Sequence, residues 1–441
     1  MMRRRKVKKK VKIFGVIIIL FILAIIFIFN NNSREVEKSV IPKVDYVSAI
    51  LESSDNLFDK DFLNWIENNY GANVLKDLNN KFINNSYDVK AWHELTGNSF
   101  IVLQDLYHNR YENNRDVSYI SGNKDSISVG FAGDVCLADN WFIMPEYTKR
   151  GRGVWGVLSK NMADYMKKLD WMTVNSEFAF SNRGTAMAGK LYTFRAKTSN
   201  VSVYDEMGVD MVTLANNHVY DFGKDAFYDT LNTLREANLP YIGAGENAAE
   251  AQKAHYLIIN GYKISFLSAT RAEKYILTPE AGDNSPGVFR CYDPTRLSER
   301  IKEEKTNSDF VVAIVHWGKE NYHDLEDVQR ETGKLYIDSG ADMVIGHHAH
   351  VLQGVEFYKG KLIAYNLGNF LFNYYVLDTG IIEWKLSNSG ESEFYFFPAI
   401  QQNNSTSELT GEEAKRLYQN MTDWSINASF LEDGKIVEKT N

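Results

Sequence analysis

Residues 340–354 read Gly-Ala-Asp-Met-Val-Ile-Gly-His-His-Ala-His-Val-Leu-Gln-Gly. An apolar run ends at Gly346, and three of the nine histidines of the chain follow at once: His347, His348 and His350. A buried strand that ends there would present these imidazoles at the carboxyl edge of a sheet, where open α/β folds bind ligands. Imidazole is the commonest metal ligand in proteins. The stretch therefore predicts an α/β fold with a ligand site at the strand ends, and its alternative is a histidine-rich surface loop.

The composition is that of a globular chain whose charge is very unevenly distributed. The 441 residues, 44% of them hydrophobic, are enough for one large or two ordinary domains. Residues 1–12 carry eight Lys and Arg and no acid, so a net charge of −8 for the whole chain leaves −16 on the remainder. Such an acidic body argues against nucleic acid as a partner. Two cysteines are too few for a disulfide framework or a cysteine-type zinc site.

The N-terminal region predicts a membrane anchor. Residues 13–29 contain no charge, and seventeen residues are close to the lower limit for a spanning helix. The preceding basic cluster places the N-terminus in the cytoplasm. A cleaved signal peptide is the alternative, but no small-x-small cleavage site follows the apolar run. We expect a cytoplasmic tail at 1–12, a single-pass transmembrane signal anchor at 13–30, and the main domain outside the cell.

Hydrophobic periodicity divides the rest of the chain. Residues 31–125 predict a stalk and a small helical region, with apolar residues at helical spacing near 62–66 and 74–82 and a linker at 115–125. Strands alternating with helices predict an α/β layered domain at 126–400. The expected strands are 127–132, 171–175, 210–214, 263–269, 310–315, 342–345 and 362–365, followed by antiparallel strands at 380–386 and 392–400. The expected helices are 154–169, 224–238, 294–304 and 325–339. Residues 401–441 predict a polar tail with one helix at 411–420.

Polar, ligand-type side chains follow five of these strands. They are Asp134, Glu177, the segment with Asn217, His218 and Asp221, the segment with His316 and Glu320, and the histidines of 340–354. Carboxylate, amide and imidazole groups together suit a divalent ion of the Mn, Fe, Zn or Ca type. Asp134 and Glu177 could bridge two ions roughly 3.5–4 Å apart, the arrangement with which phosphatases and nucleases activate water. The alternative is that these residues cap helices and turns without metal.

The histidine spacing leaves one assignment open. His348 and His350 lie on the same side of an extended segment, whereas His347 points away. His347 would then support a ligand or face the substrate. Whether His347 or His348 acts together with His350 is not decided by the spacing.

A basic cluster follows Glu177. It contains Arg183, Lys190, Arg195 and Lys197, with Gly184 and Gly189 bracketing a flexible piece that suits a loop over a site. Arg195 could clamp a carboxylate or phosphate with two parallel hydrogen bonds. An ordinary solvated loop is the alternative.

Six motifs in order resemble those of the CapA family of poly-γ-glutamate capsule synthesis proteins, which includes CapA and PgsA. They are Gly-Asp-Val-Cys at 133–136, Asn-Ser-Glu at 175–177, Leu-Ala-Asn-Asn-His-Val-Tyr-Asp-Phe-Gly at 214–223, Val-His-Trp-Gly-Lys-Glu at 315–320, Gly-His-His-Ala-His-Val-Leu-Gln at 346–353 and Tyr-Asn-Leu-Gly-Asn-Phe at 365–370. That family belongs to the calcineurin-like metallophosphoesterase superfamily. The resemblance implies a four-layer α/β/β/α sandwich, with the metal held by Asp134, Glu177, Asn217, His218, His316, His348 and His350.

The sequence departs from the superfamily pattern at three points. Cys136 stands where the first motif has a histidine, Glu177 replaces a bridging aspartate, and the last histidine motif is one residue longer. These departures leave open whether one metal ion or two are bound.

The resemblance implies a membrane-anchored, metal-dependent hydrolase or transferase of capsule synthesis or export, acting on an anionic polymer or its intermediate. Its partners would be the membrane and other capsule synthase subunits. His218 beside Asp221 would act as acid or base, with His316 as a further catalytic candidate. Arg195, Lys190, Glu320 and His347 would contact the substrate. The alternatives are a non-catalytic subunit of a polymer synthase and a metallophosphoesterase unrelated to capsule.

Overall fold

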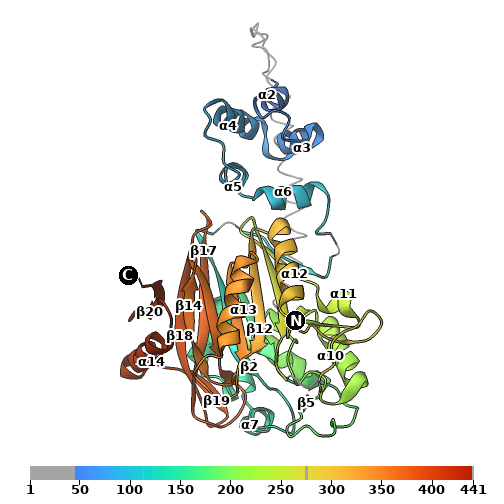
Figure 1. Ribbon diagram of the computed structural model, residues 1–441, viewed down its shortest axis with the longest axis vertical. Coiled ribbons are helices and arrows are strands. Elements are labelled where there is room, and N and C mark those ends of the chain that lie inside the picture. The colour runs from blue at the N-terminus through green and yellow to red at the C-terminus, as the bar shows by residue number, and fades with distance from the viewer. Residues whose placement is uncertain (1–44, 113, 123, 274–276, 440–441) are drawn as a thin grey trace, which may run out of the picture.

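The computed structural model describes residues 45–439 except 113, 123 and 274–276. It shows a small helical unit standing on a larger α/β body (Figure 1). The predicted basic tail and membrane anchor lie outside the described residues. Among those that are described, no helix is long and apolar enough to cross a membrane.

The helical unit is built from short amphipathic helices. They are α2 (Tyr46–Ser53), α3 (Lys60–Tyr70), α4 (Ala72–Ile83), α5 (Ala91–Thr96) and α6 (Phe100–Tyr107). Their core buries Phe62, Ile66 and Leu75, as the helical spacing of these residues predicts, and also Trp92. The Asp59 carboxylate caps α3 by accepting from the backbone N–H groups of Asp61 and Phe62.

Buried polar contacts join the helical unit to the body. The Lys263 ammonium donates to Asp105 Oδ2 at 2.6 Å, and both side chains are less than a tenth exposed. His93 stacks on Tyr262 with ring centroids 4.2 Å apart. Separation would leave the buried Lys263 ammonium without its carboxylate partner, which is unfavourable, so this junction resists separation.

The body contains two large mixed sheets. The first has seven strands in the order β1-β9-β10-β12-β13-β15-β14. Their bounds are β1 (Val117–Ile120), β9 (His255–Ile259), β10 (Tyr262–Thr270), β12 (Phe310–Trp317), β13 (Met343–His348), β15 (Lys361–Leu367) and β14 (Leu352–Tyr358). Strands β10, β12, β13 and β15 are parallel.

The second sheet has ten strands, with β20-β21-β18-β17-β2-β3-β6-β7 in order, β16 beside β2 and β19 beside β18. Their bounds are β20 (Ala428–Phe430), β21 (Lys435–Glu438), β18 (Ser392–Gln402), β17 (Leu377–Ser387), β2 (Ser126–Val135), β3 (Trp171–Ser176), β6 (Met211–Thr213), β7 (Tyr241–Ile242), β16 (Asn369–Leu371) and β19 (Ser405–Glu408). Strands β2, β3, β6 and β7 are parallel. Two small two-stranded sheets pair β8 (Ala244–Gly245) with β11 (Gly287–Val288) and β4 (Ala179–Phe180) with β5 (Arg195–Ala196).

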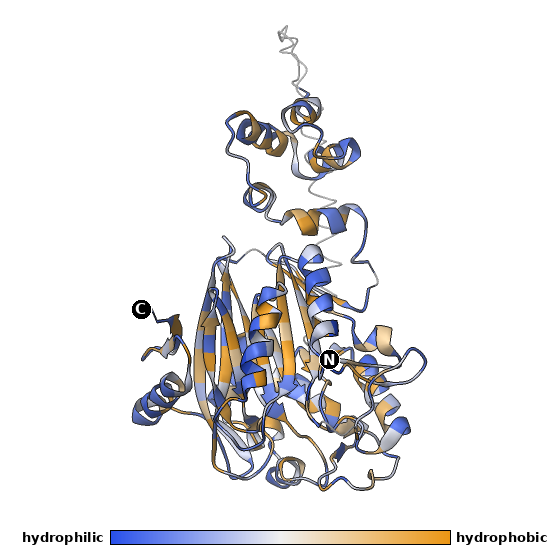
Figure 2. Cartoon of the chain, viewed as in Figure 1, coloured by the Kyte–Doolittle hydropathy of each residue, from blue (hydrophilic) through white to orange (hydrophobic). Residues whose placement is uncertain are grey.

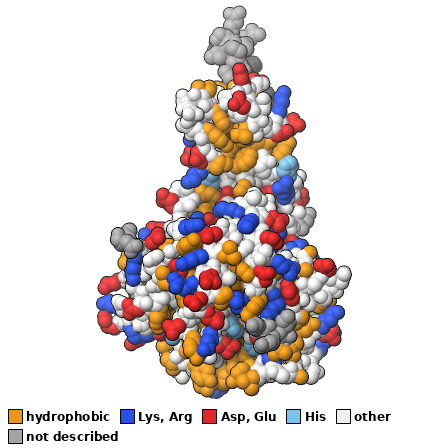
Figure 3. Space-filling model, viewed as in Figure 1, with side chains coloured by type: hydrophobic (Ala, Val, Ile, Leu, Met, Phe, Trp, Pro, Cys, Tyr) orange, Lys and Arg blue, Asp and Glu red, His pale blue; other side chains and the backbone are white. Residues whose placement is uncertain are grey.

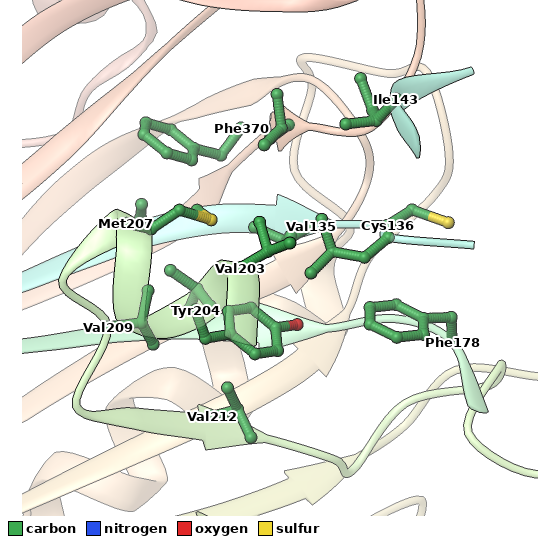
Figure 4. Close-up of a cluster of buried hydrophobic side chains, with 14 of the residues drawn as sticks. Val135, Cys136, Ile143, Phe178, Val203, Tyr204, Met207, Val209, Val212 and Phe370 are labelled. Carbon is green, nitrogen blue, oxygen red and sulfur yellow. The ribbon is translucent and has the colours of Figure 1, made fainter. Parts of the chain in front are cut away.

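Three cores arrange the body in layers of helix, sheet, sheet and helix. The sheets face each other across a core that joins Phe131 and Trp171 of one to Phe266 and Ile314 of the other. A second core packs helices against the outer face of the ten-stranded sheet, and Figure 4 shows part of it around Tyr204. A third covers the seven-stranded sheet. Because the strands are covered on both faces, they are largely apolar in Figure 2, whereas the outer helices α12 and α13 also carry hydrophilic residues. The predicted α/β class is confirmed.

The body helices are mostly where the periodicity predicts them. They are α7 (Ile143–Arg150), α8 (Lys160–Lys168), α9 (Ser202–Met207), α10 (Gly223–Ala237), α11 (Ala248–Ala251), α12 (Thr295–Asn307), α13 (Asp327–Asp338) and α14 (Gly411–Trp424), with 3₁₀ turns η1 (Gly153–Gly156) and η2 (Thr198–Val201). The helix expected at 154–169 is instead split into η1 and α8. Leu158 forms a bridge with Thr406, and Ser159 caps α8 by accepting from Met162 N.

Two segments have more structure than the sequence suggested. The expected linker at 115–125 contains β1, whose residues Val117–Ile120 pair with Tyr256–Ile259 of β9. The expected polar tail contributes β19, β20 and β21 to the ten-stranded sheet. The strands in both segments have only three or four residues, too few for a clear alternation, and β1 and β21 are ordered by pairing with β9 and β18, which local periodicity does not record.

We expect Lys263→Met to lower the free energy of unfolding by about 2 kcal/mol, because the buried Asp105 carboxylate loses its closest cation and keeps Arg110, 2.9 Å away. Urea unfolding of the full chain measures the loss. Lys253→Met is the matched control: its side chain is 57% exposed and pairs with Asp116, so its loss should stay below about 1 kcal/mol. Equal losses in the two variants would contradict a structural role for the junction.

Candidate metal centre

The carboxyl ends of the parallel strands of both sheets meet at one place. Asp134 lies on β2, His316 on β12, and His347 and His348 on β13. Glu177 follows β3 directly. The register sets neighbours: Asp134 is paired with Asn175 on one side and with Asn369 on the other, and His316 is paired with His347. The two sheets thus supply ligand-type side chains to one shared edge.

The Asp134 carboxylate is wholly buried and surrounded by donors. Oδ1 accepts from Asn175 Nδ2 at 2.8 Å and lies 3.4 Å from His347 Nδ1. Oδ2 lies 3.3 Å from His350 Nδ1 and accepts from the His348 backbone N–H at 3.3 Å. Burial alone would raise the pKa of Asp134, but the contacts with His347 and His350 outweigh it and hold the pKa well below its usual range. Asp134 is therefore ionised.

Glu177 stands at the centre of the cluster. Its Oε2 accepts from Asn175 Nδ2 at 3.0 Å, so one amide holds both carboxylates. Its Oε1 is buried and has no hydrogen-bond partner. This oxygen faces Nε2 of His316 at 3.6 Å, of His350 at 3.9 Å and of His218 at 4.0 Å. Burial, followed by the charge of Asp134, raises the pKa of Glu177 well above its usual range.

A cation would satisfy this unpartnered oxygen, and the surrounding atoms fit one. Two groups of donor atoms lie within 4.8 Å of one another: Glu177 with His316 and His348, and Glu177 with Asp134 and His350. His348 Nδ1 is also buried without a partner. Carboxylate and imidazole donors without thiolate suit Mn, Fe or Zn. The donor set therefore fits a divalent ion, and Glu177 is common to both groups.

The protonation states of the histidines agree with a role as metal ligands. Burial, aided by neighbouring histidines, lowers the pKa of His348 to about 3 and that of His316 well below its usual range. Both are neutral, as metal ligands must be. Burial would also lower the pKa of His350, but Glu177 and Asp134 raise it to about 10. A metal ion that takes the His350 nitrogen must therefore displace a proton.

The backbone leaves the extended conformation at His348, the last residue of β13. φ is +96° at His348 and +60° at His350, a region that residues other than glycine rarely adopt. The expected extended segment is therefore wrong, and His347 does not point away from the site but lies against Asp134. His350 Nδ1 is also 2.8 Å from Asn369 Oδ1, which helps to hold the turned segment. Such uncommon conformations are often found where function requires a particular side-chain direction.

His218 is held by a buried pair of charges. Its Nδ1 lies 2.7 Å from Asp221 Oδ2, which also accepts from the Phe194 backbone N–H at 2.7 Å. Asp221 Oδ1 pairs with Lys190 Nζ at 2.8 Å. Burial lowers the pKa of His218 in spite of Asp221, so its ring is neutral. Asp221 thereby fixes the orientation of His218, and its contact with Nδ1 leaves Nε2 directed at Glu177.

The expected substrate contacts occupy different environments. Lys190 has a side chain only 5% exposed, and its ammonium also contacts the Asn217 carbonyl, so it supports His218 from within. Arg195 lies over the Phe222 ring, and its Nη1 donates to the Arg183 and Gly184 carbonyls at 3.0 Å each. Asn217 directs Oδ1 to His316 Nε2 at 2.9 Å. Glu320 is exposed beyond the end of β12.

Three asparagines complete the site and were not among the predicted residues. Asn175 holds both carboxylates, and its Oδ1 accepts from Asn216 Nδ2 at 3.1 Å. Asn216 Oδ1 accepts from the backbone N–H groups of His218 and Val219 at 3.0 Å each. Asn369 contacts His350. All three lie inside the motifs at 175–177, 214–223 and 365–370, so their position at strand ends was the available signal.

Comparison with known proteins assigns the chain to a family. Residues 128–374 match the family model of the bacterial capsule synthesis protein PGA_cap, and the chain belongs to that family. The match spans every residue of the metal centre described above.

Two relatives come from Bacillus. The capsule biosynthesis protein CapA of Bacillus anthracis is 30% identical over 295 residues, which are 64% of this chain and 71% of that protein. The PGA biosynthesis protein CapA of Bacillus subtilis (strain 168) is 29% identical over 327 residues, 71% of this chain and 82% of that protein. Among solved structures, a phosphatase of Mycoplasma pneumoniae aligns with a TM-score of 0.41 and 12% identity over 63% of this chain and 95% of its own, a likeness too weak to carry an argument.

We expect the purified full chain to bind about two ions, one for each group of donors, and Glu177→Gln to abolish both because the two groups share this side chain. His348→Ala should retain about one ion, since it removes a donor from one group only. Elemental analysis after dialysis measures the stoichiometry, and His108→Ala in the helical unit is the control. Full metal content in Glu177→Gln would show that Glu177 is not shared.

Proposed function

We propose that this protein is a membrane-anchored, extracellular, metal-dependent hydrolase or transferase of poly-γ-glutamate capsule synthesis or export. Family membership and the names of the two Bacillus relatives support the biological role. The substrate would be the anionic polymer or its intermediate. Other membrane subunits of the capsule synthase would be its partners, and nucleic acid would not be one, because the body is acidic.

One observation carries the catalytic part: the buried, unpartnered Glu177 Oε1 faces three imidazole nitrogens from two sheets. Asp134, Glu177, His316, His348 and His350 would hold the metal, which supplies Lewis acidity toward a phosphoester or amide and its attacking water. His218 is a neutral base held by Asp221 and is therefore able to accept a proton through Nε2. Asn175 keeps both carboxylates in place, and burial strengthens each charge interaction.

The position of the site supports the proposed topology. The helical unit begins at the first described residue, and the loops around α7 and β5 lie at the opposite end of the body (Figure 1). Phe194, which precedes β5, packs on His218 with ring centroids 4.5 Å apart, so the metal centre is near this far end. With an anchor at residues 13–30, the site would face away from the membrane, toward polymer outside the cell.

A non-catalytic subunit is the second candidate, and burial of the centre favours it. Asp134 and Glu177 are wholly buried, and His350 has a side chain only 14% exposed. An ion in such a place could stabilise the packing of the sheets without meeting a substrate.

The two candidates differ in what His218→Gln should do. His218 belongs to neither group of donors, so the variant should keep its metal. A catalytic site predicts roughly a 100-fold fall in polymer made by cells, because proton transfer is lost. Capsule polymer and metal content are measured together, at matched protein levels, in a strain that lacks the native copy.

His108→Gln serves as the matched control, since His108 is exposed in the helical unit. Normal capsule from His218→Gln and from a metal-free Asp134→Asn protein would reject the catalytic proposal. Loss of phosphoester hydrolysis with normal capsule would instead favour a phosphoesterase unrelated to capsule.

A further inference from the structure

A continuous row of aromatic rings lies at the end of the body that holds the metal centre. The aromatic row consists of Tyr192, Trp141, Phe142, Tyr374 and Tyr375, in that order. Successive ring centroids are 5.8, 4.6, 4.7 and 4.6 Å apart. The three tyrosines are 54%, 46% and 55% exposed. Figure 3 shows hydrophobic side chains gathered at this lower end of the body.

The aromatic row is continuous with the metal centre. The Trp141 ring lies 4.7 Å from that of Phe194, which packs on His218 at 4.5 Å. Phe372, 5.5 Å from Phe194, packs on His350 at 4.9 Å. Two buried phenylalanines therefore connect the exposed rings to two histidines of the site, so a chain lying on the row would lead toward those histidines.

The backbone that carries Tyr374 and Tyr375 is held by a buried side chain, that of Gln401. Buried Gln401 accepts through Oε1 from the backbone N–H groups of Phe372 and Asn373, at 2.7 and 2.9 Å. Its Nε2 donates to Asn373 Oδ1 at 2.8 Å, and that oxygen accepts from Tyr375 N at 3.0 Å. A wholly buried glutamine thus holds a turn that presents apolar rings to water. Rings fixed in this way lose little conformational entropy when a ligand covers them.

A cationic segment runs beside the aromatic row. Residues 183–197 contain four Lys and Arg and no acid, in a chain of net charge −8. Arg183 is paired with Asp229 at 2.8 Å and Lys190 is buried against Asp221, which leaves Arg195 and Lys197 as the cations beside the rings. Asp139 N donates to the Arg195 carbonyl at 3.0 Å, and Lys197 N donates to Asp139 Oδ2 at 2.6 Å, two residues before Trp141. The Lys197 side chain is 67% exposed, and its ammonium is 3.7 Å from Asp139, a weak surface pair. Lys197 is therefore available to an anionic ligand next to the rings, and so are the Nε and Nη2 donors of Arg195, whose Nη1 is already bonded to two backbone carbonyls.

We propose that the aromatic row is the binding surface for an extended polyamide chain that carries carboxylates, and that it guides this chain to the metal centre. The rings cover planar amide groups, while Arg195 and Lys197 pair with the carboxylates. A neutral glycan also stacks on aromatic rings, but it carries no carboxylate to pair with the two cations. The positive charge beside the rings therefore favours the polyamide as the ligand. The inference deepens the proposed function and rests on it for the identity of the substrate.

Binding of defined poly-γ-glutamate oligomers to the full-length protein in detergent tests the inference. The double variant Tyr374→Ala/Tyr375→Ala should raise the Kd about 10-fold or more, and Tyr374→Phe/Tyr375→Phe should restore it because the rings remain. Tyr119→Ala is the matched control, since Tyr119 is equally exposed at 55% but lies on β1. Raising the salt concentration should weaken binding, because the carboxylate contacts are screened.

An unchanged Kd in the double alanine variant, or tighter binding of a neutral glycan oligomer than of the polyamide, would overturn the inference. Metal content of the same samples separates this result from a failure of the proposed function. Binding that depends on the aromatic row in a protein without metal would keep the row as the polymer surface while rejecting the metal-dependent reaction. Unchanged binding by the double alanine variant, with full metal content, would reject the aromatic row as the binding surface and leave the proposed function standing.

Discussion

The Asn175 amide holds two buried carboxylates, Asp134 and Glu177, next to each other, and the rest of the site depends on this contact. Two like charges removed from water are strongly unfavourable unless positive charge or donors surround them. The donors come from the other sheet, as imidazoles of His316, His347 and His350. The electrostatics of one edge thus require the two sheets to meet with their carboxyl ends together, and the core between the sheets makes that possible.

Each sheet brings half of the centre. The ten-stranded sheet supplies Asp134, Glu177 and His218 through strand ends, and the seven-stranded sheet supplies His316 and the histidines after β13. The chain returns from β15 to β16, which pairs with β2 and places Asn369 between Asp134 and His350. This crossing ties the two halves covalently at the point where their polar groups meet.

Much of this was accessible from the sequence because strand ends are marked locally. Apolar runs followed by Asp134, Glu177 or His316 define both the strand and the direction of its ligand-type side chain, and parallel strands bring such ends together. The turn at His348 and His350 was missed because spacing alone assumes an extended backbone, whereas the contacts with Asp134 and Asn369 impose positive φ. Lys190 was expected to contact the substrate because it lies in a glycine-flanked loop after Glu177; its burial depends on Asp221, 31 residues later in the chain. The strand β1 was likewise missed, because it is formed by pairing with β9, which lies more than a hundred residues later in the chain.

A centre made from both sheets has a consequence for the lifetime of the protein. An ion that binds donors from both sheets acts as a crosslink across the central core, and it binds the folded chain only. Its free energy of binding is then added to that of folding, in proportion to the logarithm of the free ion concentration. In the absence of the ion, the buried Asp134 charge and the buried atoms without a partner, Glu177 Oε1 and His348 Nδ1, would favour local separation of the sheet ends and expose that edge to proteases. The supply of metal would thus regulate how long the folded protein survives, independently of any reaction at the site.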